Sequence, residues 1–289
     1  MCDQEMVTRW ARQALTRRSF GAGALAAAGT VACAPVQGTP DNAAAPDASG
    51  RKVTFATPAG TMDGEFFHPA RGKHPAVIMW PDIAGIRPAK RQMARRLADE
   101  GYAVLLANPY YRDVAGQQFE DFAGFAANGG FETVKPWRGK FTPATIQNDA
   151  RACAQWLFAQ DQVDTSRGIG TQGYCMTGSF AVVAPSADDH IRVGASFHGG
   201  GLVRGDGPSP HAMLRSDAHY LIAISQDDDA KQPDAKTALR AAADATGADA
   251  EIEVYPADHG WCVPDSPAYD RLQAERAWTR LLATYSDGL

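Results

Sequence analysis

The stretch Gly168-Ile169-Gly170-Thr171-Gln172-Gly173-Tyr174-Cys175-Met176-Thr177-Gly178, followed by the apolar run 179–184, decides the fold. A strand-like run, a sharp turn and a helix-like run in this order form a nucleophile elbow, G-x-S-x-G, with cysteine in place of serine. The flanking glycines permit a close backbone crossing. The turn would present the sulfur at the carboxyl edge of a sheet, facing a helix N-terminus that favours a thiolate and an oxyanion. The motif alone is weak evidence for a nucleophile, because cysteine is also a common core residue.

Outside this stretch, the chain from Arg51 onward alternates between predicted strands and helices. Strands are expected at 53–56, 64–67, 75–80, 102–107, 168–172, 193–197, 219–224 and 251–255, and helices at 88–100, 145–158, 179–184, 234–245 and 268–285. The first two strands form a hairpin around Pro58-Ala59-Gly60. Apolar strands that alternate with helices predict an α/β fold, a mostly parallel sheet with helices on both faces. Residues 112–141 show no clear period and are expected to cross the rim of the site.

Composition limits the function classes. The chain has 289 residues, of which 45% are hydrophobic and 21% charged, as expected for one globular domain with a large core. Residues 1–34 hold four Arg against one Asp and one Glu, which leaves 24 basic and 31 acidic residues, a charge of -7, for the rest. An acidic domain argues against nucleic-acid binding. No apolar run is long enough to span a membrane.

The N-terminus resembles a targeting segment. Thr16-Arg17-Arg18-Ser19-Phe20 is a twin-arginine signature, and a Gly/Ala-rich apolar run leads to the small residues Ala32-Cys33-Ala34. We expect a signal peptide at 1–34, a flexible linker at 35–50, a single α/β domain at 51–289, and export to the periplasm. The alternatives are an ordinary amphipathic helix, or a lipid anchor at Cys33, which is less favoured because Thr30 stands where a lipobox has leucine.

Candidate partners for Cys175 follow the last two predicted strands. Asp227-Asp228-Asp229 comes after strand 219–224, and His259 comes after strand 251–255. Cysteine, acid and histidine in this order match an α/β-hydrolase. A thiol needs a base to become a nucleophile, and the base needs a carboxylate to orient it. The acidic run could instead be a solvated turn, His259 could be a surface histidine, and the sequence pattern does not choose among the three acids.

An oxyanion site is expected after strand 75–80, at Trp80-Pro81-Asp82-Ile83-Ala84-Gly85. The backbone N–H groups of Ile83 and Met176 would bind the developing negative charge. Asp82 would place an ionisable group near the thiol. The alternative is that the Asp82 side chain only caps the turn.

Three other residues, Cys153, Cys262 and His198, give weaker indications of a role at the site. Cys153 lies on the apolar face of a predicted helix and is expected in the core, while Cys262 is near His259 and could line the pocket. His198 follows a strand, but three glycines after it favour a loop role. No C-x-x-C or H-E-x-x-H spacing occurs, so no metal site is predicted.

Together these residues resemble the dienelactone hydrolase family, from about Val53 to the C-terminus. The resemblance lies in 173–178, in the acid after strand 219–224, in His259-Gly260-Trp261, in 82–85 and in Asn108-Pro109-Tyr110-Tyr111-Arg112. It implies a triad of Cys175, His259 and Asp228, no metal or organic cofactor, and a small ester or lactone as substrate.

The resemblance also implies roles at the substrate. Asp82 stands where family members that open dienelactone have a Glu switch, and Arg112 matches an arginine that holds the substrate carboxylate, with Tyr111 and Trp261 as further contacts. The expected second arginine is replaced at Trp261-Cys262-Val263-Pro264. We therefore predict a cysteine-dependent ester or lactone hydrolase. The alternatives are a broad-specificity exported esterase or peptidase, and a non-catalytic binding protein on the same fold.

Overall fold

The computed structural model describes residues 49–205 and 207–289. The predicted leader with its twin arginines and Cys33 lies outside these residues, as does the linker up to residue 48. The first strand begins at Ser49, two residues before the expected start of the domain.

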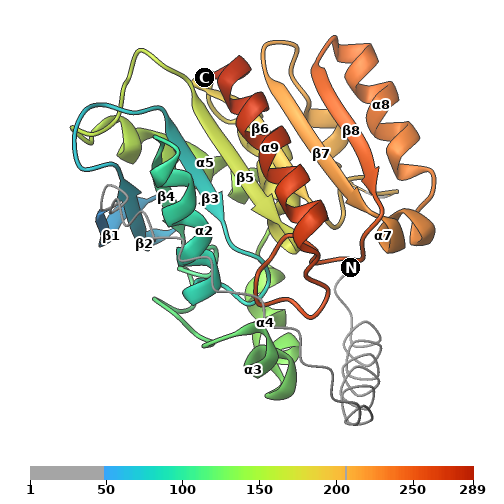
Figure 1. Cartoon of the computed structure of the whole chain (residues 1–289), viewed down its shortest axis with the longest axis horizontal. Helices are drawn as coiled ribbons and strands as arrows, with labels where there is room; N and C mark the ends of the chain where they lie inside the picture. The colour runs from blue at the N-terminus through green and yellow to red at the C-terminus, as the bar shows by residue number, and fades with distance from the viewer. Residues whose placement is uncertain (1–48, 206) are drawn as a thin grey trace, which may run out of the picture.

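The described residues form an eight-stranded sheet with helices around it (Figure 1). The strands are β1 (Ser49–Thr57), β2 (Gly60–His68), β3 (Ala76–Trp80), β4 (Ala103–Ala107), β5 (Ile169–Tyr174), β6 (Ile191–Phe197), β7 (His219–Ser225) and β8 (Asp249–Tyr255). The α-helices are α2 (Pro88–Asp99), α3 (Phe122–Ala127), α4 (Gly130–Arg138), α5 (Pro143–Phe158), α6 (Gly178–Val183), α7 (Gln226–Lys231), α8 (Ala235–Thr246) and α9 (Arg271–Gly288). Every predicted strand is present, and the predicted hairpin is β1–β2.

The strand order is β1-β2-β4-β3-β5-β6-β7-β8. β1 pairs with β2, and β2 with β4, in antiparallel register, while all the pairs from β4 to β8 are parallel. β5, which leads into Cys175, therefore lies inside the parallel part of the sheet. The carboxyl ends of its neighbours meet at the same edge, where α/β proteins bind their ligands.

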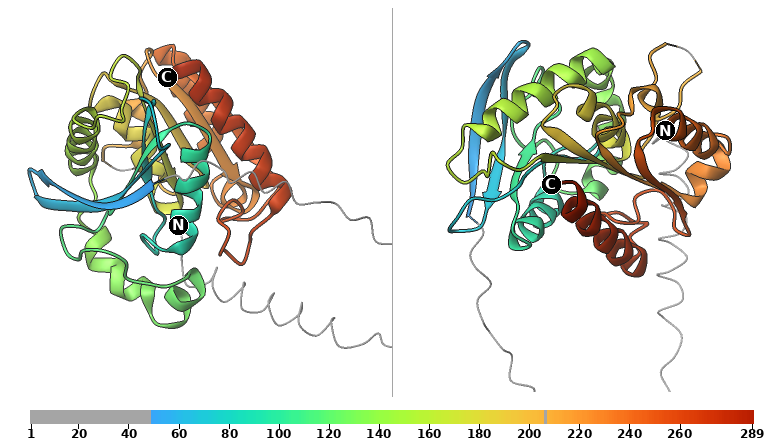
Figure 2. Two further views of the ribbon diagram at one scale, coloured as in Figure 1. Left: turned by 60° about the vertical axis from the view of Figure 1, so that its left-hand side comes forward. Right: turned by 90° about the horizontal axis from the view of Figure 1, so that it is seen from above.

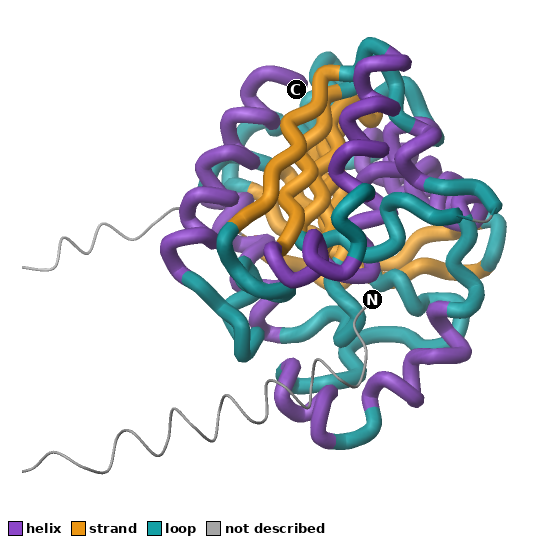
Figure 3. The backbone as a smooth tube through the Cα atoms, turned by 90° about the vertical axis from the view of Figure 1, so that its right-hand side faces the viewer, coloured by secondary structure: helices purple, strands orange, loops and turns teal. Residues whose placement is uncertain are grey.

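Helices cover both faces of the sheet, as predicted. Figure 2 shows α2 and α9 together on one face, and α5 on the other. The buried residues agree, because Met93 and Leu97 of α2 and Leu281 of α9 belong to one core cluster, and α5 and α6 contribute to another. Figure 3 shows the strands enclosed between these helical layers. Burying one such Met or Leu side chain stabilises the fold by about 1.5–3 kcal/mol.

β5 carries polar residues into this core because their side chains bind one another. Gln172 is fully buried; its amide nitrogen donates to the Tyr174 hydroxyl at 2.8 Å, and its amide oxygen accepts from the Tyr285 hydroxyl of α9 at 2.8 Å. These bonds offset the cost of burying an amide and fix α9 against the strand that carries the elbow.

Residues 112–141 differ most from the expectation of an aperiodic excursion, because they contain α3 and α4. Both helices lie beyond the carboxyl ends of the strands, at the bottom of Figure 1. The Asp121 side chain caps α3 by accepting from the backbone of Gly124, and Phe122 and Phe125 of α3 are buried. Helices this short offer too few turns for a hydrophobic period to be detected. In the part of the chain that the structure describes, no helix is long and apolar enough to cross a membrane.

Candidate active site

Cys175 follows β5 directly and has φ +57°, a left-handed conformation that is costly for a residue with a side chain. The glycines on either side of Cys175 are required because neighbouring backbone atoms leave no room for a side chain. A Cβ at Gly173 would lie 2.0 Å from the carbonyl oxygen of Thr177, and a Cβ at Gly178 would lie 2.5 Å from Cα of Gly199. The turn is therefore the sharp elbow that the sequence predicts. The α6 helix begins at Gly178, three residues after the sulfur.

Thr177 fixes the elbow to the rest of the sheet, a role that the sequence analysis missed. Its hydroxyl oxygen accepts from the backbone N–H of Tyr174 at 3.0 Å and lies 2.9 Å from the carbonyl oxygen of Pro81. The backbone N–H of Gly200 donates to the carbonyl oxygen of Cys175 at 3.0 Å. The loops after β3 and β6 are thus bound to the turn that carries the thiol.

The structure brings His259 and Asp228 together with Cys175. His259 Nδ1 lies 2.5 Å from Asp228 Oδ2, and His259 also hydrogen-bonds the Cys175 side chain. Asp228 is in the first turn of α7, where its backbone N–H donates to the hydroxyl of Ser225. Asp227 instead accepts from the backbone N–H of His259 at 2.8 Å, and Asp229 pairs with Lys236 at 2.7 Å. Geometry thus separates the three acids, and Asp228 is the one at the imidazole.

The electrostatics favour a charged imidazole. Burial alone would lower the pKa of His259, but the charge of a Cys175 thiolate and the hydrogen bond that Nδ1–H donates to Asp228 outweigh it and raise the pKa to about 10. Burial would raise the pKa of Asp228, whereas its bond with His259 holds that pKa well below the ordinary 3.8. A negative sulfur, a protonated His259 and an ionised Asp228 therefore support one another.

Ile83 and Met176, whose backbones are expected to bind an oxyanion, both line the pocket that contains Cys175. The hydroxyl of Tyr110 donates to the carbonyl oxygen of Ile83 at 2.8 Å and also contacts the sulfur of Met176. The backbone N–H of Ala84 donates to the Asp82 carboxylate at 3.0 Å. The loop after β3 is thus fixed at both sides of Ile83.

Asp82 lies near the Cys175 thiol, but its carboxylate is bound by two cations. It receives a bidentate pair from Arg87 at 2.7 and 2.9 Å, and Lys90 Nζ lies 3.0 Å away, with all three side chains nearly or fully buried. Burial would raise the pKa of Asp82, but the two cations outweigh burial and lower the pKa far below 3.8. A carboxylate held in this way stays ionised, which opposes the proton-accepting switch suggested by the family resemblance.

Cys175 opens on a cavity of about 660 Å³ at the carboxyl edge of the sheet. Its walls include Ile146 of α5, Phe180 of α6 and the loop after β6. The charged side chains that line it are Arg138, Arg204, Lys231 and Asp228. Among the described residues, the cations Arg138, Arg204 and Lys231 outnumber the Asp228 carboxylate on this wall, which gives it an excess of positive charge.

Arg112, Tyr111 and Trp261 do not line this pocket. Both terminal nitrogens of Arg112 bind the carboxylate of Asp149 at 2.8 and 2.7 Å, and the hydroxyl of Tyr111 donates to the same carboxylate at 2.7 Å. Trp261 is fully buried, stacked on Tyr255. Their side chains are bound within the fold around the site, so the structure does not bring these three residues to the pocket wall, and substrate contact by them stays a prediction.

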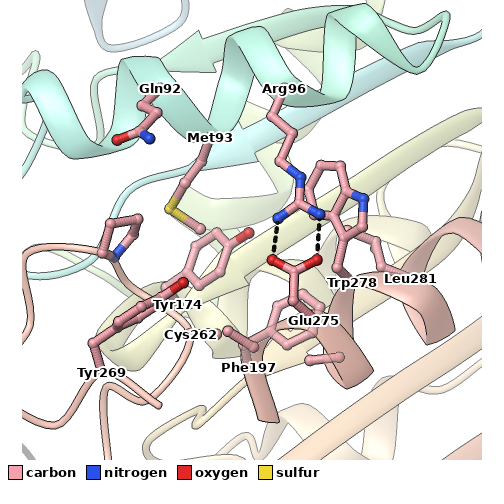
Figure 4. Close-up of a pocket in the computed structure, with 13 residues that line it drawn as sticks. Gln92, Met93, Arg96, Tyr174, Phe197, Cys262, Tyr269, Glu275, Trp278 and Leu281 are labelled. Atoms are coloured by element: carbon pink, nitrogen blue, oxygen red, sulfur yellow. Dashed lines mark hydrogen bonds and ion pairs between the residues drawn. The ribbon is translucent and has the colours of Figure 1, made fainter. Parts of the chain in front are cut away.

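Cys153 is fully buried, as expected, and contacts Met62. Cys262 is partly exposed but lines a different cavity, of about 380 Å³, between α2 and α9 (Figure 4). Tyr174 and Phe197 also line this second cavity, and the Arg96–Glu275 ion pair crosses it. Cys262 is therefore not a wall of the pocket that contains Cys175.

His198 differs from its expected loop role. It follows β6 directly, is almost fully buried, and its Nδ1 lies 3.3 Å from Nε2 of His259. Within the described residues, no group of three or more His, Cys, Asp or Glu side chains is arranged to hold a metal ion.

Known proteins resemble the chain over most of its length. It is 26% identical to a "Putative carboxymethylenebutenolidase" of Escherichia coli (strain K12) over 223 residues, covering 73% of this chain and 76% of the relative. A protein of the same name from Synechocystis is also 26% identical, over 73% of this chain and 85% of the relative.

Solved structures share the fold. The crystal structure titled "Putative Dienelactone Hydrolase from Klebsiella pneumoniae" superposes with a TM-score of 0.70 at 24% identity, covering 82% of this chain and 98% of that one. An acylaminoacyl peptidase of Pyrococcus horikoshii superposes with a TM-score of 0.58 at 17% identity, and the match covers 42% of that chain. The family model described as "Dienelactone hydrolase family" matches residues 62–287, more than three quarters of the chain. The chain thus belongs to the dienelactone hydrolase family.

Proposed function

We propose that the protein hydrolyses small carboxylic esters or lactones with Cys175 as nucleophile, His259 as acid and base, and Asp228 as the group that orients His259. The observation that carries the proposal is the bonded series of Cys175, His259 and Asp228, located where the elbow opens on the pocket. The elbow and this order of residues are the arrangement that nucleophilic acyl transfer requires.

In the proposed reaction, the Cys175 sulfur attacks the carbonyl carbon and the carbonyl oxygen becomes an oxyanion. The backbone N–H groups of Ile83 and Met176 stabilise that charge. The carbon–oxygen bond to the leaving group then breaks, and the alkoxide takes the Nε2 proton of His259. A thioester remains on Cys175. His259 next removes a proton from water, the hydroxide attacks the thioester, and breakage of the carbon–sulfur bond releases the acid and restores the thiolate.

Binding of an anionic substrate group follows from the pocket. Arg204 lies in the loop after β6, where its Nε donates to the carbonyl oxygen of Gly201, and among the described residues no side chain pairs with its terminal nitrogens. Lys231 is about half exposed and lies 3.8 Å from Asp228. We propose Arg204, Lys231 and Arg138 in place of Arg112 as the cations that attract a substrate carboxylate.

The test compares hydrolysis of p-nitrophenyl acetate and of a dienelactone by the wild-type protein and by Cys175→Ala. Loss of at least about a thousandfold in kcat for both substrates is expected in the variant. A variant as active as the wild type would refute the mechanism. Turnover of the acetate alone would keep the cysteine mechanism and exclude the lactone as a substrate.

Export to the periplasm, predicted from the leader, is also a proposal. Fractionation of cells that produce the full chain, compared with a variant in which Arg17 and Arg18 are both Lys, tests it. Equal periplasmic amounts of the two proteins would contradict a twin-arginine leader.

A further inference from the structure

His198 is a buried imidazole next to the candidate base. Its backbone has φ +41°, a left-handed conformation, and its N–H donates to the carbonyl oxygen of Ala223 on the neighbouring strand β7 at 2.8 Å. A residue with a side chain occupies this region only at a cost of about 1–3 kcal/mol, and such residues are common at functional sites. The strain directs the ring from the end of β6 toward the site.

Aromatic rings hold the imidazole in place. The centroid of the His198 ring lies 4.5 Å from that of His259, 5.3 Å from that of Trp261 and 6.2 Å from that of Tyr174. His198 also lines a small cavity together with Cys175, Asp82 and His259. The His198 ring is therefore packed among three rings, next to Cys175 and His259.

The contact between the two histidines requires one proton. Nδ1 of His198 and Nε2 of His259 are 3.3 Å apart, so one nitrogen must donate and the other accept. Burial, and then the nearby charge of His259, lower the pKa of His198 well below 6.5, whereas the pKa of His259 is raised. His259 is thus the protonated partner and the donor.

Other charges reach the pair from several elements. Lys90 of α2 disfavours a charge on His198, while Asp228 of α7 and Asp82 of the loop after β3 favour one, more weakly than burial opposes it. Cys175 and Asp228 are the groups that favour a charged His259. The balance leaves a neutral His198 beside a charged His259.

We propose that His198 is a positioning residue whose Nδ1 accepts a hydrogen bond from Nε2–H of His259, so that this proton is shared between His198 and the Cys175 sulfur. The inference rests on the proposed role of His259 and extends it to a residue outside the triad. His198 must then carry its own proton on Nε2. This second acceptor stabilises the imidazolium and holds its proton directed toward the sulfur and, later, the leaving group.

The experiment compares His198→Asn with His198→Phe. Asparagine can place an acceptor near the position of Nδ1 and tolerates positive φ, whereas phenylalanine fills the space without an acceptor. His190→Asn is the control, because His190 is an exposed histidine that pairs with Asp188 away from the pocket. The readout is the rate of alkylation of Cys175 by iodoacetamide from pH 5 to 10, resolved by peptide mass spectrometry so that Cys262 does not contribute.

For His198→Phe we expect the midpoint of the alkylation profile to rise by about one pH unit, and the rate at pH 6 to fall about tenfold. His198→Asn should remain within about threefold of the wild type, since its acceptor replaces Nδ1. Equal profiles for the Phe and Asn variants, or an unchanged midpoint in the Phe variant, would overturn the proposal and leave His198 a packing residue.

A second measurement requires no variant. In ¹⁵N spectra of the wild-type imidazoles at pH 7, we expect His198 to be neutral with an unprotonated Nδ1, and His259 to be protonated on both nitrogens. A proton on Nδ1 of His198 would refute the inference even if His198→Phe failed to fold. Neither readout uses a substrate, so failure of the proposed hydrolysis and failure of the His198 inference are distinguishable.

Discussion

Replacing Arg87 by methionine should destabilise the protein strongly, because Arg87 joins two carboxylates in the interior. Its side chain is fully buried and binds Asp82 at 2.7 and 2.9 Å and Asp265 at 2.7 and 2.8 Å. In Arg87→Met, Asp82 would retain Lys90, but Asp265 would lose its cation, while still accepting from the backbone N–H of Phe122.

The expected loss in the free energy of unfolding is about 3 kcal/mol. Removing one partner of a buried ion pair costs about 3–5 kcal/mol, and the lower end applies because the Asp265 side chain is 21% exposed and can be hydrated in part. Urea unfolding followed by tryptophan fluorescence measures this loss, with an unchanged m-value showing that only stability has changed.

Two comparisons make the reasoning on Arg87 refutable. Arg280→Met removes an ion pair with Glu251 in which the arginine side chain is 48% exposed, so a loss below about 1 kcal/mol is expected. Adding Asp265→Asn to Arg87→Met should recover part of the stability, because the unpaired carboxylate is removed. A loss for Arg87→Met no larger than that of the control, or no recovery in the double variant, would refute the role of Arg87.

Three further predictions follow from the site. Gly178→Ala should lower the melting temperature through contact with Gly199, at a cost of about 1–3 kcal/mol, whereas Gly205→Ala, with nothing within 4 Å, should not; equal melting temperatures would contradict the elbow packing. Arg204→Gln should reduce kcat/KM about fivefold for an anionic p-nitrophenyl ester but not for the acetate, and the effect should vanish at high salt; a salt-independent loss would rule out charge attraction. Since His259 must be protonated to release the leaving group and its pKa is raised to about 10, kcat/KM should fall as pH rises through about 10 rather than near 6.5, which a pH–rate profile measures.

The sequence was sufficient to predict the sheet, and the edge at which Cys175, His259 and the acidic run lie, for physical reasons. Strands such as Ala76–Trp80 are apolar throughout because both faces are covered, and that pattern is visible in the chain. Parallel strands place Cys175, Asp228 and His259 at one edge whatever the details of packing. The prediction of Asp228 came from the family resemblance, and only the geometry separates it from Asp227 and Asp229.

The pocket wall and the supporting polar groups could not be predicted in the same way. Arg138 and Lys231 lie in helices of nine and six residues, too short for a hydrophobic period to reveal. Arg112 was expected to hold substrate, yet its guanidinium binds the carboxylate of Asp149 in α5, and side-chain pairing of this kind leaves no pattern in the sequence. Arg204 could have been found, since it follows β6 at the expected edge.

The ion pair between Arg87 and Asp265 also has a consequence for how the protein matures. The two residues are 178 positions apart, so this contact of the loop after β3 forms only when the chain beyond β8 has docked. Contacts between such distant residues form late, because closing a long loop is entropically costly. A refolding chain should therefore recover its circular dichroism before its activity. The recovery of activity would then follow the docking of the segment beyond β8, whereas circular dichroism would follow the formation of the sheet.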